Sequence, residues 1–166
     1  MIIKGRTYTE LIENKDLMTY LTRLNPKAIV MDLARSYHKF CAEIFPNALR
    51  IADHFHVNRY ITDALQAVRR RVSQTLASDS VKYLNRYKNL LSQRWDELKE
   101  KDQTKLLKVL SFSNELADVY QIKERLIDWY ELSDSSNSYR RLNKWIEKGE
   151  SLNISELNEG LRPFKN

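Results

Sequence analysis

Two aspartates are the residues of this chain whose type and position most directly suggest chemistry. Asp32 follows the apolar run 28–31, and Asp53 follows the run 49–52, which is apolar except for Arg50. A short apolar run between turn-forming residues is typical of a buried parallel strand, and a carboxylate after such a strand points into the crevice where open α/β sheets bind ligands. Because adjacent strands lie about 4.8 Å apart, the two carboxylates could share a divalent metal ion.

A plainer interpretation competes with this metal pair. An aspartate between a strand and a helix commonly caps that helix, and from spacing alone this is the better interpretation of Asp32 and Asp53. Two carboxylates are also too few for a Mg²⁺ site, which needs waters and substrate phosphates as well. His56 is expected near the start of a helix, with local hydrogen bonds. The histidines and Cys41 match no tetrahedral zinc spacing, so a zinc site is not expected.

The densest basic patch is a second candidate site. It consists of Arg69, Arg70 and Arg71 together with Arg59 and Lys82. Three consecutive arginines on a helix point in different directions, so they cannot all line one groove, and a solvated face is slightly favoured. The functional alternative is contact with nucleic-acid phosphates, which would be independent of sequence and sensitive to salt.

Aromatic and basic residues alternate between residues 83 and 95, as they do in platforms that stack on nucleic-acid bases. The residues are Tyr83, Tyr87 and Trp95, interleaved with Arg86, Lys88 and Arg94. Aromatic residues at helical spacing more often pack in a core, and that interpretation is favoured here.

A strand–helix–strand unit positions the two aspartates. A capping-box pattern at Thr7 begins a helix that is expected to end near Asn25. Strands over 28–31 and 49–52 then enclose a further helix that stops at Pro46. This order predicts a βαβ unit with a right-handed crossover.

From residue 56 onwards the apolar residues repeat at helical spacing. The pattern predicts a long helix up to about residue 76, further helices over 84–98 and 103–110, one capped by Ser113, and one ended by Gly149 in left-handed geometry. The fold class is therefore α+β and mostly helical. A small α/β part over residues 1–78 is expected to precede an all-α subdomain over residues 79–166.

Composition sets the remaining limits. The 166 residues include only 3 Gly and 3 Pro, which leaves little punctuation for a fold of many strands. The 28 basic residues exceed the 22 acidic ones by 6, which favours polyanions as partners. The single cysteine, Cys41, excludes an internal disulfide and is expected to be buried as a small hydrophobe. No apolar stretch could span a membrane and no signal peptide is recognisable, so a cytoplasmic protein is expected.

Several stretches, taken in order, resemble the middle of bacterial insertion-sequence transposases of the ISL-three family. They are Gly5-Arg6-Thr7, Val30-Met31-Asp32 with Tyr37, Phe45-Pro46-Asn47-Ala48, Ala52-Asp53-His54-Phe55-His56-Val57, and Glu115-Leu116-Ala117-Asp118-Val119-Tyr120-Gln121-Ile122-Lys123-Glu124. Each stretch is short, but the ordered set covers most of the chain and is fairly specific.

The resemblance implies a ribonuclease-H-like core whose DDE carboxylates hold two Mg²⁺ ions and catalyse DNA strand cleavage and transfer at transposon ends. It places Asp32 at the second catalytic aspartate, in the role of a metal ligand. Asp53 and His56 match a family motif to which no chemical role is assigned. The helices after Ser78 correspond to the insertion that such transposases carry before their last acidic residue.

The resemblance also implies that two of the three carboxylates lie outside this chain, because the first is expected before Ile2 and the last after Asn166. Glu159 only imitates the local pattern around the last one. We therefore expect a transposase fragment that is inactive alone and binds Mg²⁺ weakly. The alternative is a non-catalytic regulator, derived from a transposase, that binds DNA or protein. Without its neighbouring strand, segment 29–31 would have an unpaired edge, which amino-terminal residues or a second copy of the chain would cover.

Overall fold

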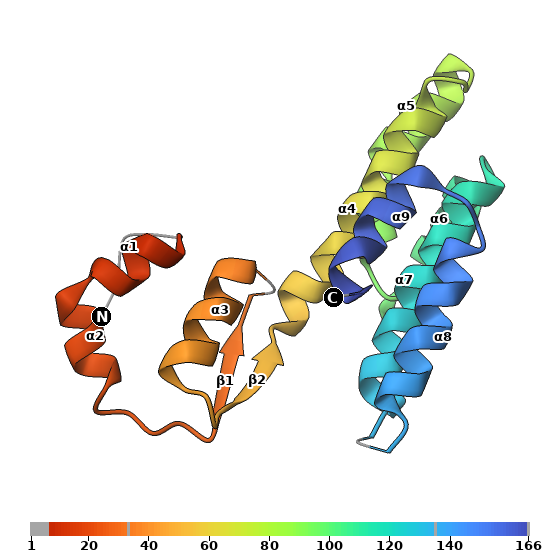
Figure 1. Cartoon of the computed structure of the whole chain (residues 1–166). Coiled ribbons are helices and arrows are strands. Elements are labelled where there is room, and N and C mark those ends of the chain that lie inside the picture. Colours follow the sequence, from red (N-terminus) through yellow and green to blue (C-terminus); the bar gives the residue numbers. More distant parts are fainter. Residues whose placement is uncertain (1–6, 33, 135, 166) are drawn as a thin grey trace. The chain divides into compact units, whose positions relative to one another are not determined.

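The computed structural model describes residues 7–32, 34–134 and 136–165, and the chain divides into two compact units (Figure 1). Residues 1–57 are called the amino-terminal unit below, and residues 58–166 the helical unit. The division falls within the long helix α4 (His54–Ser73) rather than near Ser78, since the part of α4 beyond Val57 packs with the helices that follow. The assignment of residues 1–78 to a catalytic core remains a prediction.

The amino-terminal unit contains the expected strand–helix–strand motif. Strands β1 (Ala28–Met31) and β2 (Leu49–Ala52) are joined by helix α3 (Arg35–Ile44), and the strands are parallel. The register pairs the first residue of each strand and continues in step to the last. Both strands therefore end at the same edge of the sheet, which confirms the parallel pairing predicted from the sequence.

Two short helices precede the motif where one was expected. The capping box at Thr7 is confirmed, and it begins α1 (Tyr8–Glu13). The next residue, Asn14, leaves the helical conformation, and its side chain accepts a hydrogen bond of 2.9 Å from the backbone N–H of Leu17. Asn14 thus ends α1 and caps α2 (Lys15–Leu21), because asparagine competes with the helix for backbone hydrogen bonds.

Only one face of the small sheet is buried. Helices α1 and α2 pack on α3 around a core that includes Leu11, Leu17, Phe40 and Cys41, as expected for the cysteine, and the inner side chains of β1 face the same core. The outer face carries Val30, Leu49 and Ile51, whose exposed fractions are 67%, 65% and 41%. The expectation of fully buried strands is therefore wrong, since the described residues supply a helical layer on one side only.

The edge of β1 has no third strand beside it among residues 7–32, 34–134 and 136–165. Residues 1–6, which were expected to cover this edge, lie outside the described residues. Its coverage by a second copy of the chain stays a prediction.

The helical unit consists of α4 beyond Val57 and the helices that follow it. They are α5 (Ser78–Arg86), η1 (Lys88–Ser92), η2 (Trp95–Glu97), α6 (Glu100–Leu110), α7 (Asn114–Leu132), α8 (Ser138–Glu150), α9 (Ser155–Leu161) and η3 (Arg162–Lys165). The helix expected over 84–98 is wrong, because that stretch is the end of α5 followed by two 3₁₀ turns. The cap at Ser113 is confirmed, since its side chain accepts from the backbone of Leu116.

Two buried glycines show how closely these helices pack. Gly149 lies inside α8 and does not end it in left-handed geometry, as had been expected; the positive φ of 54° belongs to Asn153. A Cβ added at Gly149 would lie 2.7 Å from a methyl carbon of Leu161. A Cβ at Gly160 would lie 3.0 Å from both the carbonyl oxygen of Tyr60 and the Cβ of Ala64. At Gly160 a side chain would press on the backbone of α4, whereas at Gly149 it would press only on the flexible end of the Leu161 side chain.

The fold class predicted from the sequence is confirmed: the protein is α+β and mostly helical. Across the described part of the chain, no helix combines the length and the apolar character needed to cross a bilayer.

Candidate catalytic site

Asp32 stands at the carboxyl end of β1 and does not cap the helix that follows. The N-cap of α3 is Ala34, and no side chain forms a capping hydrogen bond there. About a third of the Asp32 side chain is exposed. The capping interpretation therefore does not explain Asp32, and its carboxylate lies at the edge where both parallel strands end.

Asp53 continues the sheet by one residue and begins α4. Its backbone N–H donates to the carbonyl of Met31 over 2.7 Å, and its own carbonyl accepts from the N–H of Val57 over 3.1 Å. The ladder and the first turn of α4 thus share this residue. The position of Asp53 therefore determines where the first turn of α4 places the following side chains, including that of His56.

His56 lies between the two aspartates. Its Nδ1 atom is 3.5 Å from Oδ2 of Asp32, and its Nε2 atom is 3.8 Å from Oδ2 of Asp53. One turn of helix separates His56 from Asp53, which puts the two side chains on the same face. The parallel register brings in Asp32 from the neighbouring strand. The structure therefore groups all three residues that the sequence analysis had singled out at this edge.

The contacts within this group are long and partly exposed to solvent. Both distances are those of ion pairs and exceed a normal hydrogen bond. The side chains of His56, Asp32 and Asp53 are 35%, 32% and 40% exposed, so solvent weakens their attraction. A neutral imidazole donates from one nitrogen and an imidazolium from both. Either form can restrict the rotamer of a neighbouring carboxylate.

A shared metal ion between Asp32 and Asp53 does not fit this arrangement, because the imidazole ring occupies the space between them. Within the described ranges, no three His, Cys, Asp or Glu side chains are grouped so that they could hold a metal ion. Asp32 still offers carboxylate oxygens of the kind that Mg²⁺ prefers. These residues alone do not form a complete metal site, and no reaction step through a metal is derived from them.

The candidate DNA-binding arginines point in different directions, as the sequence predicted. Arg69 is buried, and its guanidinium donates to Gln66 over 2.8 Å and to Asn85 over 2.7 Å. Arg70 is exposed. Arg59 pairs with Asp63 at 3.4 Å on the surface of α4. The structure does not gather these side chains on one surface of α4, and their contact with DNA remains a prediction.

Arg71 and Lys82 both have carboxylate partners. Arg71 lies 2.7 Å from Glu115 of α7 and 2.6 Å from Glu156 of α9, so it links three helices. Its hydrogen bond lowers the pKa of Glu156 to about 2. Lys82 pairs with Asp79 at 3.2 Å, and both side chains are largely exposed. Of the two, only Lys82 leaves most of its side chain open to a ligand.

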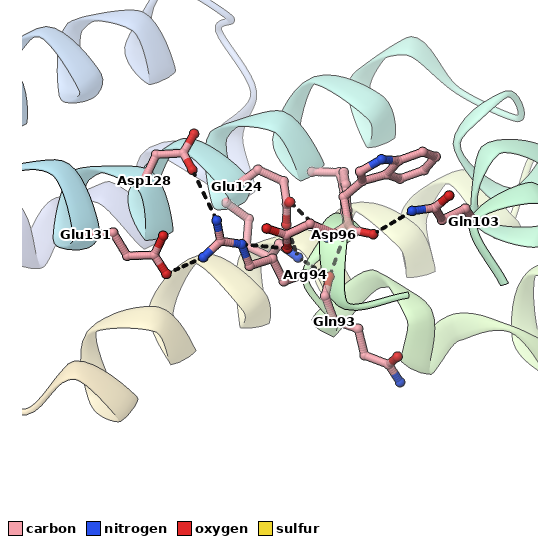
Figure 2. Close-up of polar contacts among 10 residues, drawn as sticks. Gln93, Arg94, Asp96, Gln103, Glu124, Asp128 and Glu131 are labelled. Atoms are coloured by element: carbon pink, nitrogen blue, oxygen red, sulfur yellow. Dashed lines mark hydrogen bonds and ion pairs between the residues drawn. The ribbon is translucent and has the colours of Figure 1, made fainter. Parts of the chain in front are cut away.

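Figure 2 shows a polar network in the helical unit that the sequence analysis missed. Lys123 of α7 is 2% exposed; its ammonium donates to the carbonyl of Gln93 and pairs with Glu124 at 2.7 Å. Burial lowers the pKa of Lys123. Glu124 in turn accepts from the backbone N–H of Trp95 over 3.0 Å. A lysine on the apolar stripe of α7 was the signal in the sequence for this network.

Arg94 extends the network along the surface of α7. It pairs with Asp96 at 2.7 Å, with Asp128 at 3.8 Å, and with Glu131 (Figure 2). Gln103 of α6 donates to the carbonyl of Trp95 over 3.0 Å. These contacts hold the 3₁₀ segment against α6 and α7. Because Arg94 and Trp95 are engaged in these contacts, they do not fit a platform that stacks on nucleic-acid bases.

Comparison with known proteins gives one match. The family model described as transposase, for the DDE enzymes of the ISL-three family, matches residues 1–166. No curated protein and no solved structure gives a significant match.

Proposed function

The chain belongs to the ISL-three family of DDE transposases, and we propose that it acts in DNA transposition through Asp32, as one of the carboxylates of the catalytic centre. The reaction class is metal-dependent cleavage and transfer of DNA strands at transposon ends. The observation that carries the proposal is the place of Asp32: it ends a parallel strand, is partly exposed, and caps no helix. A carboxylate at that edge is placed to face a ligand.

We propose Mg²⁺ as the ion that Asp32 helps to hold. A hard cation prefers carboxylate oxygens and keeps several waters, so one carboxylate from this edge is a normal contribution to such a site. When bound in the complete centre, the ion stabilises the negative charge that develops on the phosphate. The role of this chain in that centre is to hold the Asp32 carboxylate in a fixed orientation.

His56 is the proposed positioning residue for Asp32. The contact at 3.5 Å from Nδ1 restrains the carboxylate, while the contact at 3.8 Å from Nε2 to Asp53 restrains the ring itself. This gives a role to the Asp53 and His56 motif, which the resemblance left without one. Metal ligands commonly depend on such outer contacts, whose loss weakens metal affinity by about 10–100-fold.

A metal-binding measurement on the purified chain tests the role of Asp32. We expect Mn²⁺, used as a paramagnetic substitute for Mg²⁺, to broaden the backbone resonances of residues 31 and 32. Asp32→Asn should abolish that broadening, because an amide is a much poorer ligand. Asp16→Asn, with the same change of charge on the exposed surface of α2, is the matched control. Equal broadening in the Asp32 variant would overturn the role.

The same Mn²⁺-binding measurement distinguishes the roles of the two ring nitrogens of His56. Asparagine places its amide nitrogen near the position of Nδ1, and glutamine places its own near Nε2. His56→Asn should therefore keep Mn²⁺ affinity near the native value, while His56→Gln should lower it about tenfold. Equal affinities for these two variants would contradict a positioning role.

A cell-based transposition assay with the reading frame that encodes this chain tests the function itself. Loss of a metal-holding carboxylate removes several kcal/mol of transition-state stabilisation, so Asp32→Asn should lower the frequency roughly 1,000-fold. An unchanged frequency in the Asp32 variant would favour the alternative function, a non-catalytic DNA- or protein-binding regulator. The observation that favours this alternative is the large helical unit, which forms a compact unit with its own buried core and contains neither Asp32 nor Asp53.

A further inference from the structure

We propose that a surface of the helical unit formed by α5 and α6 binds the phosphate backbone of duplex DNA. This tyrosine–lysine face consists of Tyr83, Arg86, Tyr87, Lys101, Lys105 and Lys108. The choice of DNA as the ligand rests on the proposed function. The face is distinct from the arginine cluster of α4, in which Arg69 and Arg71 are engaged by other residues of the helical unit.

Two tyrosine rings form the centre of the face. The centroids of Tyr83 and Tyr87 are 4.7 Å apart, as expected for residues one helical turn apart. Tyr83 also contacts Phe112 edge to face, with centroids 6.0 Å apart. This packing gives the rings a fixed position, and both remain partly exposed.

Three cations lie over these rings. The ammonium of Lys108 is 4.4 Å from the centroid of Tyr83. Tyr87 has two such neighbours, the ammonium of Lys105 at 5.3 Å and the guanidinium of Arg86 at 5.6 Å. The aromatic rings hold long basic side chains near one another, and the far side of each cation can still meet a phosphate.

Basic residues outnumber acidic residues on the tyrosine–lysine face. Lys101, Lys105 and Lys108 follow a spacing of four and then three residues, which places them on one side of α6. Lys105 pairs with Asp102 at 2.6 Å, and this hydrogen bond raises the pKa of Lys105, so it stays protonated. Within residues 7–32, 34–134 and 136–165, Arg86 and Lys108 lie within ion-pair distance of no carboxylate.

Duplex DNA is the polyanion that suits this chemistry. It carries one negative charge per about 1.7 Å of axis, so a row of cations along two helices meets several phosphates at once. Tyrosine hydroxyls also donate to phosphate oxygens. Lysine and tyrosine contacts of this kind position DNA without reading its sequence, so the face should bind duplexes of any sequence and weaken steeply with salt.

A salt series of binding measurements on the full chain tests the proposal. We would follow the fluorescence anisotropy of a labelled 30-base-pair duplex of arbitrary sequence. The double variant Arg86→Gln/Lys108→Gln should weaken binding at least about tenfold and reduce the slope of log K against log salt by about 2, because two phosphate contacts are lost. The matched control is Lys144→Gln/Lys148→Gln, which removes the same charge from exposed positions on α8.

The outcomes separate this inference from the proposed function. An equal loss in the control would show that net charge alone attracts DNA, and would overturn the face. Equal or tighter binding of a single strand of the same length would also overturn it in favour of base stacking. If the double variant loses binding while Asp32→Asn leaves transposition unchanged, the face stands and the proposed function fails; the converse result separates them the other way.

Discussion

The two units of this molecule achieve stability by different means. In the helical unit, side chains such as Leu65, Leu106 and Leu126 have no exposed surface, and the buried Lys123 pairs with the partly exposed Glu124. In the amino-terminal unit, Leu11, Leu17 and Cys41 each keep 6–9% of their surface exposed, and the sheet is covered on one side only. Asp32, Asp53 and His56 lie in the amino-terminal unit, whose core is less completely buried. The larger core belongs to the helical unit.

Stability and the candidate chemistry therefore belong to different units of this chain. A closely packed helical core tolerates few changes of side-chain volume, because neighbouring side chains already fill the space around each buried residue. A small sheet with an exposed edge keeps its carboxylates accessible, but the same exposure leaves it with a weaker core. Asp32 therefore depends on a unit whose own stability is expected to be modest.

The chain carries a separate natural reporter in each unit. All three tryptophans, Trp95, Trp129 and Trp145, belong to the helical unit, so their fluorescence follows its unfolding. The single cysteine, Cys41, is buried in the amino-terminal unit, so its reaction with a thiol reagent follows the opening of that unit. Both measurements can be made on one sample during urea unfolding.

The largest effect is expected from truncation of the helical core. Leu65→Ala should lower the free energy of unfolding seen by tryptophan fluorescence by about 3–4 kcal/mol, because it leaves a cavity in a fully buried site. Leu17→Ala in the amino-terminal unit should cost about 2 kcal/mol, measured by the reactivity of Cys41 in urea. Equal costs, or a larger cost for Leu17, would contradict the comparison.

The buried cation gives the next effect. Lys123→Met should lower the stability of the helical unit by about 2 kcal/mol, because the carboxylate of Glu124 loses its cation and keeps the N–H of Trp95, while the carbonyl of Gln93 keeps only the hydroxyl of Tyr120 as a donor. The estimate is below that for a fully buried pair, since Glu124 is 22% exposed. Lys144→Met, at an exposed position of α8, is the control and should change fluorescence-detected stability by less than about 0.5 kcal/mol. A loss no greater than that of the control would mean that Lys123 only fills space.

Acid should selectively weaken the contact between α4 and α9. The folded-state pKa of Glu156 is lowered from 4.5 to about 2, so its contribution is present above pH 4.5 and is lost as pH falls towards 2. We expect about 1–2 kcal/mol in that window, after allowance for the partial exposure of Arg71. Glu156→Gln should remove this part of the pH dependence from the fluorescence-detected transition. The same acid dependence in the variant would assign the loss to other carboxylates.

The smallest effect is expected on the outer face of the sheet. Val30→Thr keeps the branched shape at a position that is 67% exposed, so the reactivity of Cys41 in urea should shift by less than about 0.5 kcal/mol. Ile29→Thr, on the inner face of the same strand, should cost clearly more. A large effect at Val30 would show that its face is covered in solution.

Local signals in the sequence predicted much of this fold. The two strands follow from their apolar runs, and α3 ends before Pro46 because proline disfavours helical geometry in the residue before it. The capping residues Thr7 and Ser113 carry their own side-chain signal. The 3₁₀ segment around Trp95 has no such signal, since tertiary contacts with Glu124 and Gln103 define it.

The candidate site was predictable in its members but not in its arrangement. A spacing of three residues on a helix puts His56 beside Asp53, but only the register of two parallel strands brings Asp32 to the same imidazole. Gly149 shows the opposite limit. A glycine near a helix end favours a left-handed cap, yet this one lies inside α8 and packs against the Leu161 side chain, which no local pattern reveals.

The close approach of Gly160 to α4 also sets the order in which the chain can fold during its synthesis. The contacts of α9 with Tyr60 and Ala64 join the last helix to the first helix of the same unit. The described contacts of the amino-terminal unit can form once residue 57 has emerged from the ribosome, whereas the helical unit must wait for residue 161. At ordinary rates of translation this interval is on the order of 5–20 s, during which the apolar face of α4 remains open to chaperones.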